Sequence, residues 1–406
     1  DGRWVTTWTA APQPIDSNTQ PPELYDDGVV FANASIRQTI RLSIGAERFR
    51  FRFSNAFGLR DLPITKITIA QPVPHAGRNE TGSHGIDLNT IHTITFSGQE
   101  SVLLPPAALA VSDPVPLEVA NGQALSITIY LRDGFKSDQL TAHPISRTDT
   151  YLSLGDNTES ADWDVLWKKS RQGWYFLSGV EAWRPSNFRA LILLGDSLTD
   201  GSHSSFNADA RWPNVLFNRM QAAGVDDISV LNQGAAGNRE LTDGTGGKNA
   251  VSRIDRDVLA YSSLAYAFMF EGINDINFAG GSSASQNEVA ERLISSYQQT
   301  ITRLHAFGVP VFMSTIGPFA CTHPGAKYRE AIREQTRLRV NDWIRSSGWP
   351  DAVVDFDVVL RDTNNQTEFN PNLDSGDCIH PNDEGYRLMA EAFPLQLFDS
   401  FKYGVS

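Results

Sequence analysis

The chain has 406 residues, of which 41% are hydrophobic and 20% are charged, and its formal net charge at pH 7 is −13. This composition is typical of a globular protein, and the length favours two domains. The negative charge argues against nucleic acid or an anionic membrane as a partner, because both repel an acidic surface. No run of about 18 apolar residues, the length needed to span a bilayer, occurs in the sequence.

Several features of the sequence bear on where the protein works. The chain begins at Asp1 rather than at an initiator Met, which we interpret as a mature, processed protein. Three sequons for N-glycosylation occur, at Asn33, Asn79 and Asn365. The two cysteines, Cys321 and Cys378, fit either buried thiols in a cytosolic protein or one disulfide in a secreted protein. We favour the disulfide and expect an extracellular glycoprotein.

The segment from Trp4 to about Trp183 has the alternating pattern of β-strands. In residues 36–53, phenylalanines at 49, 51 and 53 alternate with arginines at 48, 50 and 52, as in a strand with one buried face. The intervening 45–47 segment (Gly-Ala-Glu) predicts a hairpin turn. Further short strands are expected near 64–70, 91–96, 117–120, 124–131 and 173–183. We therefore predict an N-terminal all-β sandwich or jelly roll over residues 1–185.

After residues 184–187 the pattern changes to strands that alternate with helices. Short apolar strands are expected near 188–194, 228–232, 264–270, 309–315 and 352–356. Amphipathic helices are expected at 287–308, 327–348 and 382–398, the last of them bent or broken at Pro394. This alternation predicts a second domain, residues 186–406, in which helices cover both faces of a parallel sheet.

Polar side chains and glycines follow several of these predicted strands. Ser197 lies just after the first strand, in "GDSLTDG", while "NQGAAGN" and "GIND" follow the second and third strands. Sites in open parallel sheets lie beyond the carboxyl ends of the strands, so we expect these motifs to meet. Each motif alone is also ordinary turn chemistry.

A serine hydroxyl becomes a nucleophile near neutral pH only with a base, an orienting carboxylate and donors for the developing oxyanion. Asp377 and His380 lie three residues apart before the last helix, where one short turn could provide the first two. An isolated D-x-x-H is equally compatible with a helix cap or a pair of metal ligands. His323, which also follows a strand, is the alternative base.

Taken together, "GDSLTDG", "NQGAAGN", "GIND" and "DCIH" resemble, in order and spacing, the sequence blocks of the GDSL or SGNH hydrolases. The resemblance covers about residues 187–405. The opening "WVTTWTAAPQP" and the β-rich half also look like secreted two-domain members of that family. The resemblance implies a flavodoxin-like α/β/α sandwich and ester hydrolysis through an acyl-enzyme, with no metal or organic cofactor.

The resemblance also implies roles for individual residues. Ser197 matches the nucleophile, and Asp377 and His380 match the acid and base of the triad. The oxyanion hole would consist of the Ser197 N–H, the Gly237 N–H and the Asn274 side chain. Gly237 is preferred to Gly234 because it lies five residues after the asparagine that ends the second strand.

The cysteines fall in two loops of this expected site. Cys378 lies between Asp377 and His380, although the motif does not require a cysteine there, and Cys321 follows the fourth strand. Adjacent strand ends would bring these loops together, so we expect a disulfide between them. Two buried thiols that never meet are the alternative.

We predict a secreted serine esterase that hydrolyses short-acyl carboxylic esters, with carbohydrate O-acyl esters as one candidate class. A lipase or lysophospholipase-type acylhydrolase is the first alternative, and no amphipathic lid helix is evident in the sequence to support it. The second alternative is a carbohydrate-binding protein built on an inactive hydrolase scaffold. Such a scaffold would be expected to lack one of the four side chains at 197, 274, 377 and 380. A monomer that binds a small-molecule or carbohydrate ester is expected.

Overall fold

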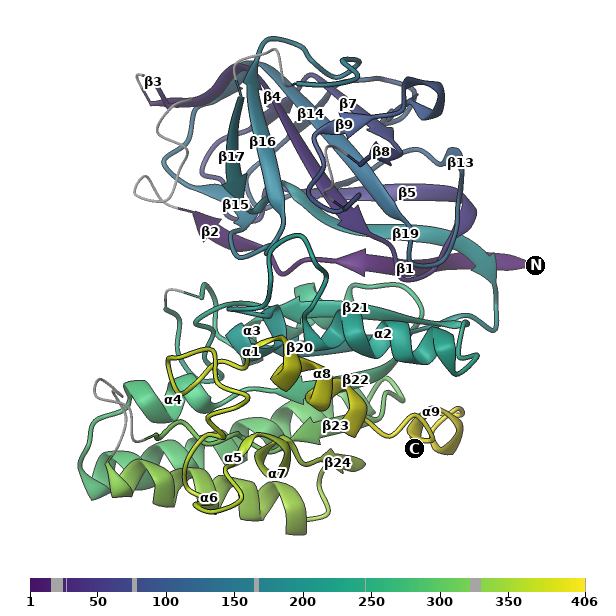
Figure 1. Cartoon of the computed structure of the whole chain (residues 1–406). Coiled ribbons are helices and arrows are strands. Elements are labelled where there is room, and N and C mark those ends of the chain that lie inside the picture. Colours follow the sequence, from purple (N-terminus) through teal and green to yellow (C-terminus); the bar gives the residue numbers. More distant parts are fainter. Residues whose placement is uncertain are drawn as a thin grey trace. The chain divides into compact units, whose positions relative to one another are not determined.

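The computed structural model describes residues 1–15, 25–26, 28–74, 79–163, 168–244, 246–321 and 330–405 (Figure 1). The chain divides into two compact units. The first contains Asp1–Phe188 and Phe206–Asp209, and the second contains Arg189–Ser205 and Ala210–Ser406. This division falls three residues after the boundary expected from the sequence, and nothing in the sequence pattern suggested that 206–209 would join the first unit.

In the described part of the first unit, antiparallel strands form two main sheets and three small ones. One main sheet has the order β1 (Gly2–Thr9), β19 (Leu177–Pro185), β5 (Ala46–Ser54) and β12 (Leu109–Val111), with β13 (Val115–Val119) also on β5. The other has the order β10 (His92–Thr93), β7 (Lys66–Ala70), β14 (Ala124–Phe135), β4 (Val29–Arg41), β16 (Asp149–Leu154) and β17 (Lys168–Gln172), with β3 (Tyr25–Asp26) on β4. The small sheets pair β11 (Val102–Leu104) with β6 (Leu62–Ile64), β8 (Pro72–Val73) with β9 (Gly85–Ile86), and β15 (Leu140–His143) with β18 (Trp174–Tyr175) and β2 (Gln13–Ile15). This architecture is consistent with the predicted β-sandwich.

The predicted hairpin at residues 45–47 is wrong. β4 pairs with β14 and β16, whereas β5 pairs with β19, β12 and β13, so the chain crosses between sheets after β4. Gly45 lacks the positive φ of a tight hairpin turn. A glycine is required at position 45 because the backbone there packs closely against residue 119. A Cβ on Gly45 would lie 2.1 Å from the Val119 carbonyl oxygen. The alternation of apolar residues was predicted correctly, and Phe49, Phe51 and Phe53 are fully buried.

The second unit contains a five-stranded parallel sheet in the order β21-β20-β22-β23-β24. These strands are β20 (Arg189–Gly195), β21 (Ile228–Gly234), β22 (Leu264–Phe270), β23 (Val311–Ser314) and β24 (Ala352–Val354). In chain order this is 2-1-3-4-5, the flavodoxin-like order, so the predicted fold class is confirmed. The topological switch lies at β20, whose neighbours β21 and β22 lie on opposite sides of it.

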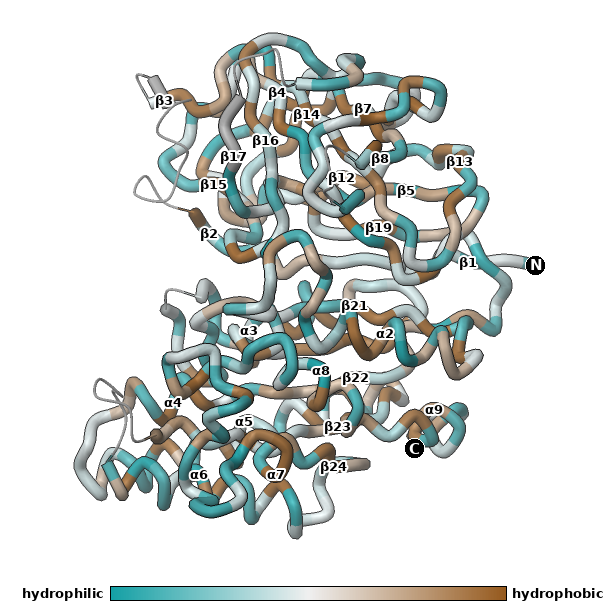
Figure 2. The backbone as a smooth tube through the Cα atoms, viewed as in Figure 1, coloured by the Kyte–Doolittle hydropathy of each residue, from teal (hydrophilic) through white to brown (hydrophobic). Residues whose placement is uncertain are grey.

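Helices cover both faces of this sheet. On one side α8 (Asp383–Ala392) packs against α2 (Trp212–Ala222) and α7 (Phe356–Leu360). On the other, α5 (Ser283–His305) packs against α3 (Ala250–Ile254) and α6 (Ala331–Ser346). The short elements are α1 (Ser197–Asp200), η3 (Asp255–Leu259), α4 (Ile273–Phe278) and α9 (Leu397–Ser400). Helices of this unit carry both hydrophilic and hydrophobic stretches along their length, as helices that bury one face should (Figure 2).

The predicted helix patterns agree with the observed packing. α5 buries Val289, Leu293, Tyr297, Ile301 and Leu304, which the sequence places on one face. The last predicted helix is interrupted near Pro394, since α8 ends at Ala392 and α9 begins at Leu397.

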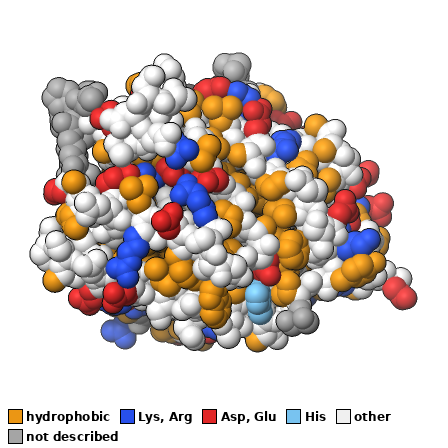
Figure 3. All heavy atoms as spheres, turned by 90° about the horizontal axis from the view of Figure 1, so that it is seen from below, with side chains coloured by type: hydrophobic (Ala, Val, Ile, Leu, Met, Phe, Trp, Pro, Cys, Tyr) orange, Lys and Arg blue, Asp and Glu red, His pale blue; other side chains and the backbone are white. Residues whose placement is uncertain are grey.

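The surface carries charges of both signs. Acidic and basic side chains are interspersed on the face shown in Figure 3, without one sign gathered across it. The three sequon asparagines, Asn33, Asn79 and Asn365, are exposed, so their glycosylation stays a prediction. None of the described helices has the length and apolar character required to cross a membrane.

Candidate active site

Ser197 lies where β20 ends and the chain turns into α1. Asp196 caps this short helix, and its carboxylate accepts a hydrogen bond from the Leu198 N–H at 2.9 Å. The turn requires close backbone approach to β21, because a Cβ on Gly234 would lie 2.2 Å from the Asp200 nitrogen. The small residues at the strand ends therefore allow Ser197 to occupy the first position of the helix, where the residue is 7% exposed.

The structure brings Ser197, His380 and Asp377 into one hydrogen-bonded chain. The Ser197 Oγ lies 2.7 Å from the His380 Nε2, and the His380 Nδ1 lies 2.6 Å from the Asp377 Oδ2. With Nδ1 carrying the proton, the imidazole donates to Asp377 and leaves Nε2 free to accept the serine proton. This arrangement can activate a serine hydroxyl as a nucleophile.

Asp377 is held in its ionised form. Partial burial would raise the pKa of this carboxyl, but the hydrogen bond and charge of His380 and two backbone N–H donors outweigh it and hold the pKa below its usual range. Those donors are the Ile379 and His380 amides, which contact Oδ1 at 3.0 and 2.8 Å. An ionised Asp377 can stabilise the imidazolium that forms when His380 takes a proton.

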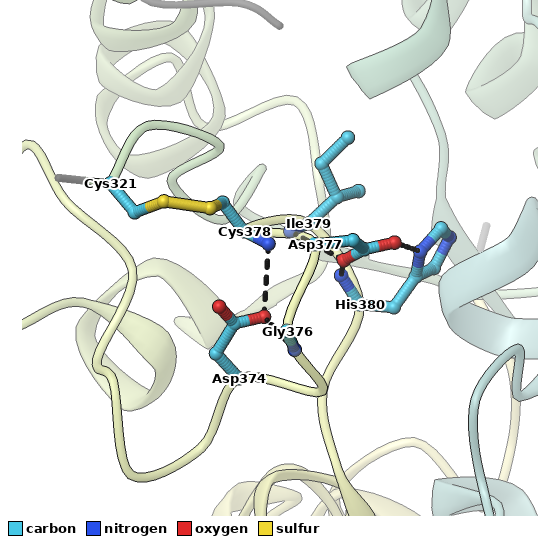
Figure 4. Close-up of a disulfide and its surroundings, with 7 residues drawn as sticks. All are labelled: Cys321, Asp374, Gly376, Asp377, Cys378, Ile379 and His380. Atoms are coloured by element: carbon cyan, nitrogen blue, oxygen red, sulfur yellow. Dashed lines mark hydrogen bonds and ion pairs between the residues drawn. A yellow bond between two sulfur atoms is a disulfide. The ribbon is translucent and has the colours of Figure 1, made fainter. Parts of the chain in front are cut away.

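The loop that carries Asp377 and His380 is itself fixed by local contacts (Figure 4). The Asp374 Oδ1 accepts hydrogen bonds from the Gly376 and Cys378 N–H groups, both at 2.9 Å. Cys378 is buried, has a φ of 68° and forms a disulfide with Cys321. The structure thus contains the disulfide expected from the sequence. Sequence reasoning missed Asp374, whose position three residues before Asp377 is the only signal of its role.

Asn274 lies near the start of α4, directly after β22. Its Nδ2 donates to the Asn238 carbonyl oxygen at 2.9 Å and lies 3.4 Å from the Asp196 Oδ2. Because Asn238 follows Gly237 in the chain, this contact joins the second and third predicted motifs. The Ser197 N–H, at the start of α1, and the Gly237 N–H, in the loop that ends at Asn238, are the other candidate oxyanion donors.

A buried arginine, Arg253 on α3, donates hydrogen bonds to backbone carbonyls at the ends of β20 and β21. Its Nη2 donates to the Gly195 carbonyl at 3.1 Å and its Nη1 to the Gln233 carbonyl at 3.0 Å. Its Nε donates to the Asn238 Oδ1 at 3.0 Å. One side chain thus fixes the ends of β20 and β21 and the residue that holds Asn274. Arg253 lies outside all four motifs, so no sequence pattern pointed to this role.

Four buried carboxyl groups lie near the strand ends, and burial raises the pKa of each. The pKa reaches about 7 for Asp196, where the Leu198 N–H and the charge of His380 act in the opposite direction. It reaches about 6 for Asp275 and about 8 for Glu240, and the pKa of Glu271 lies well above its usual range. Burial therefore moves the titration of Asp196 and Glu240 close to neutral pH.

A second histidine, His203, lies beside the chain of hydrogen bonds. Its ring stacks on the His380 ring with the centroids 5.0 Å apart and the planes 11° from parallel. Its Nε2 lies 3.5 Å from the Asp377 Oδ2, the oxygen that also contacts His380. The only sequence feature that pointed to His203 is its place in "GDSLTDGSH", six residues after Ser197.

Two groups of side chains among the described residues have the donor types of a metal site. The first is His203, Asp377 and His380, with ligand atoms within 4.8 Å of one another. Its histidine rings are nearly parallel and Asp377 already bonds His380, so the two nitrogens cannot point at one ion without breaking that bond. The second contains Cys321 and Cys378, whose sulfurs are joined in the disulfide. Neither arrangement, as it stands, fits a resident metal.

His323, the alternative base, lies outside the described residues, as does His75. Two other histidines are engaged elsewhere: His143 is buried against Trp174 in the first unit, and the His305 Nε2 lies 2.8 Å from the Asp351 Oδ2. His380 bonds both a serine hydroxyl and a carboxylate.

Comparison with protein families agrees with this geometry. The model of the GDSL-like lipase/acylhydrolase family matches residues 193–388, a range that includes Ser197, Asn274, Asp377 and His380. The chain carries a GDSL-like lipase/acylhydrolase domain. No curated protein matches the chain.

Several solved structures are similar to the GDSL-like domain. The native M. smegmatis aryl esterase is 19% identical in sequence to this chain. The alignment covers 53% of this chain and 100% of the esterase chain, with a TM-score of 0.39. A carbohydrate acetylesterase family member from Sinorhizobium meliloti is 18% identical. The alignment covers 52% of this chain and 98% of that protein's chain, with a TM-score of 0.39. The acetyl xylan esterase AlAXEase is 17% identical. The alignment covers 50% of this chain and 96% of the AlAXEase chain, with a TM-score of 0.38.

Proposed function

We propose that the GDSL-like domain is a serine esterase that hydrolyses carboxylic esters through an acyl-enzyme on Ser197. The observation that carries this proposal is the chain of short contacts, 2.7 Å from the Ser197 Oγ to the His380 Nε2 and 2.6 Å from the His380 Nδ1 to the Asp377 Oδ2. Each contact lies within hydrogen-bond range, and each partner has the chemistry that the reaction needs.

The reaction would run in two halves. The Ser197 Oγ attacks the ester carbonyl carbon as His380 takes its proton, and the carbonyl oxygen becomes an oxyanion. The carbon–oxygen bond to the alcohol then breaks, and His380 returns the proton to the leaving alcohol. In the second half His380 deprotonates a water whose oxygen attacks the acyl carbon. The bond between that carbon and the Ser197 Oγ then breaks, His380 returns the proton to the Oγ, and the acid leaves.

The developing oxyanion needs fixed donors. We assign this role to the Ser197 and Gly237 N–H groups and to the Asn274 amide. Asn238 holds that amide in place, and Arg253 holds Asn238 in turn. Donors that are already oriented cost no reorganisation when charge develops on the substrate, which is why such sites accelerate acyl transfer.

Substrate and location are the finer parts of the proposal. Ser197 is only 7% exposed, so an ester must approach the surrounding loops closely to reach its Oγ. We assign short-acyl esters, including those on carbohydrates, as the substrate class. The disulfide between Cys321 and Cys378 supports an oxidising, extracellular compartment, since such bonds seldom persist in the cytosol.

An esterase assay tests the proposal. Wild-type protein should hydrolyse p-nitrophenyl acetate faster than p-nitrophenyl esters of long acyl chains, and acetylated polysaccharides run in parallel should show whether sugar esters are accepted. Ser197→Ala should lose nearly all turnover with an unchanged melting curve. If the folded wild-type protein hydrolysed no ester but bound a polysaccharide, the inactive-scaffold alternative would replace the proposal.

A further inference from the structure

The segment that follows α1 is fixed from both of its ends. Gly201 ends the helix in the left-handed conformation, and the Ser202 N–H donates to the Ser197 carbonyl at 2.9 Å. On the other side the Tyr386 hydroxyl of α8 donates to the Ser202 carbonyl at 2.6 Å. The Ser205 N–H donates to the Asp383 Oδ1 at 2.8 Å. These contacts place the residue between them, His203, without relying on its own side chain.

His203 covers one face of the His380 ring. The centroid distance of 5.0 Å and the 11° angle describe a stacked pair, although the His203 side chain is 48% exposed. The His203 Nε2 lies 3.5 Å from the Asp377 Oδ2, which is too long for a good hydrogen bond. The contact with His380 is therefore made mainly through the face of the ring.

The orientation of an imidazole about its last side-chain torsion is only weakly set by the torsion itself, because that torsion is broad. Contacts must therefore hold the plane of the His380 ring. The hydrogen bond to Asp377 fixes one edge of the ring but leaves it free to tilt about that bond. A flat group stacked on its face opposes this tilt, which would otherwise move Nε2 away from the Ser197 Oγ.

We propose that His203 is a positioning residue that holds the His380 ring in the plane from which it can take the Ser197 proton. The inference rests on the proposed function, since it concerns the same proton transfer. It assigns the effect to the flat ring of His203 and not to its ring nitrogens. A small tilt matters because catalysis by a general base depends on heavy-atom distances within about 0.5 Å.

Substitutions at His203 separate the ring from its nitrogens. His203→Ala removes the stacked group, His203→Phe keeps a flat ring without nitrogens, and Ser202→Ala changes a neighbouring side chain as a matched control. The rate of Ser197 phosphonylation by a fluorophosphonate reports activation of the hydroxyl, and kcat and KM for p-nitrophenyl acetate report turnover. Melting curves show whether each variant is folded.

We expect His203→Ala to lower both the phosphonylation rate and kcat about tenfold, with KM little changed. In His203→Phe both the phosphonylation rate and kcat should lie within about twofold of the wild-type values. In Ser202→Ala they should lie within the same range. Equal rates for wild type and His203→Ala would overturn the inference, as would an equal loss in His203→Ala and His203→Phe. A wild-type protein in which Ser197 is not labelled at all would instead overturn the proposed function.

Discussion

The hydroxyl of Ser197 is a weak nucleophile by itself, and its proposed reactivity depends on two side chains from a loop 180 residues further along the chain. Asp377 accepts from the Nδ1 of His380 and from two backbone amides, so it orients the ring and stays ionised. Each of these contacts acts on the position or the charge of one atom. Single substitutions at this scale should therefore change the rate of the chemical step more than substrate binding.

Asn274 provides the sharpest prediction for a single residue. If its amide donates to the oxyanion, the interaction strengthens in the transition state, and losing one such donor typically costs about 3 kcal/mol. Asn274→Ala should therefore lower kcat roughly a hundred- to a thousand-fold with KM little changed. Steady-state kinetics beside a melting curve would measure this. A near-normal kcat in a protein that melts earlier would show that Asn274 only supports the turn after β22.

The three side chains of the proposed proton transfer could be predicted from the sequence. The residues that hold the site in position, His203 and Arg253, could not. Ser197, Asp377 and His380 lie in short motifs whose spacing is tied to strand ends, so their proximity follows from the fold. His203 and Arg253 reach the site through side-chain directions that only packing determines. Arg253 in particular binds two backbone carbonyls, and backbone groups leave no trace in the residue types around them.

At the scale of elements, the two periodicities of the chain predicted the second unit well and the first unit only in part. Apolar strands that alternate with amphipathic helices leave few topologies, because crossovers between parallel strands are right-handed and short. Alternation within an antiparallel strand tells which face is buried but not which strand is its neighbour. That is why Phe49, Phe51 and Phe53 were placed correctly while β4 and β5 were wrongly paired with each other.

The disulfide links the loop after β23 to the loop of Asp377 and His380, and this leads to a prediction about both. Cys321 and Cys378 are 57 residues apart, and closing a loop of that length stabilises by about 4 kcal/mol in the chain-entropy model. Reduction should therefore lower Tm and esterase activity together. Thermal melts and assays with and without reductant would measure this.

A double variant, Cys321→Ser with Cys378→Ser, controls for direct effects of the reductant. Its Tm and activity should match those of the reduced wild-type protein and should not respond to reductant. Thiol titration of unfolded, unreduced wild-type protein should find no free thiol. Two titratable thiols under those conditions would show that the bond does not form.

For the whole molecule, buried acids make stability depend on pH. Burial raises the pKa of Glu240 to about 8, against an ordinary value of 4.5, while the hydrogen bond from Ser296 acts in the opposite direction. Between these values the folded protein holds a proton that the unfolded chain has lost. The free energy of unfolding contributed by this group is thus fully present below about pH 4.5 and is lost as the pH rises to about 8.

Glu240→Gln should flatten this dependence. Between pH 5 and pH 8 the Tm of both proteins should fall. The fall should be larger for wild type than for the variant, and the difference between the two falls should be roughly 5 °C or more. Glu288→Gln, which removes an exposed charge from α5, should retain the wild-type slope. The buried acids Asp196, Asp275 and Glu271 act in the same direction in all three proteins. Identical slopes for wild type and Glu240→Gln would contradict the assignment of a raised pKa to Glu240.

The most direct test of a serine esterase in this chain is to identify the residue that reacts with a fluorophosphonate. Labelled native protein, digested and analysed by mass spectrometry, should carry one adduct, on the peptide that contains Ser197. Ser197→Ala should carry none, and denatured wild-type protein should not react, because activation depends on His380 and Asp377 in the folded structure. An adduct on another serine, or labelling that survives in Ser197→Ala, would contradict Ser197 as the nucleophile.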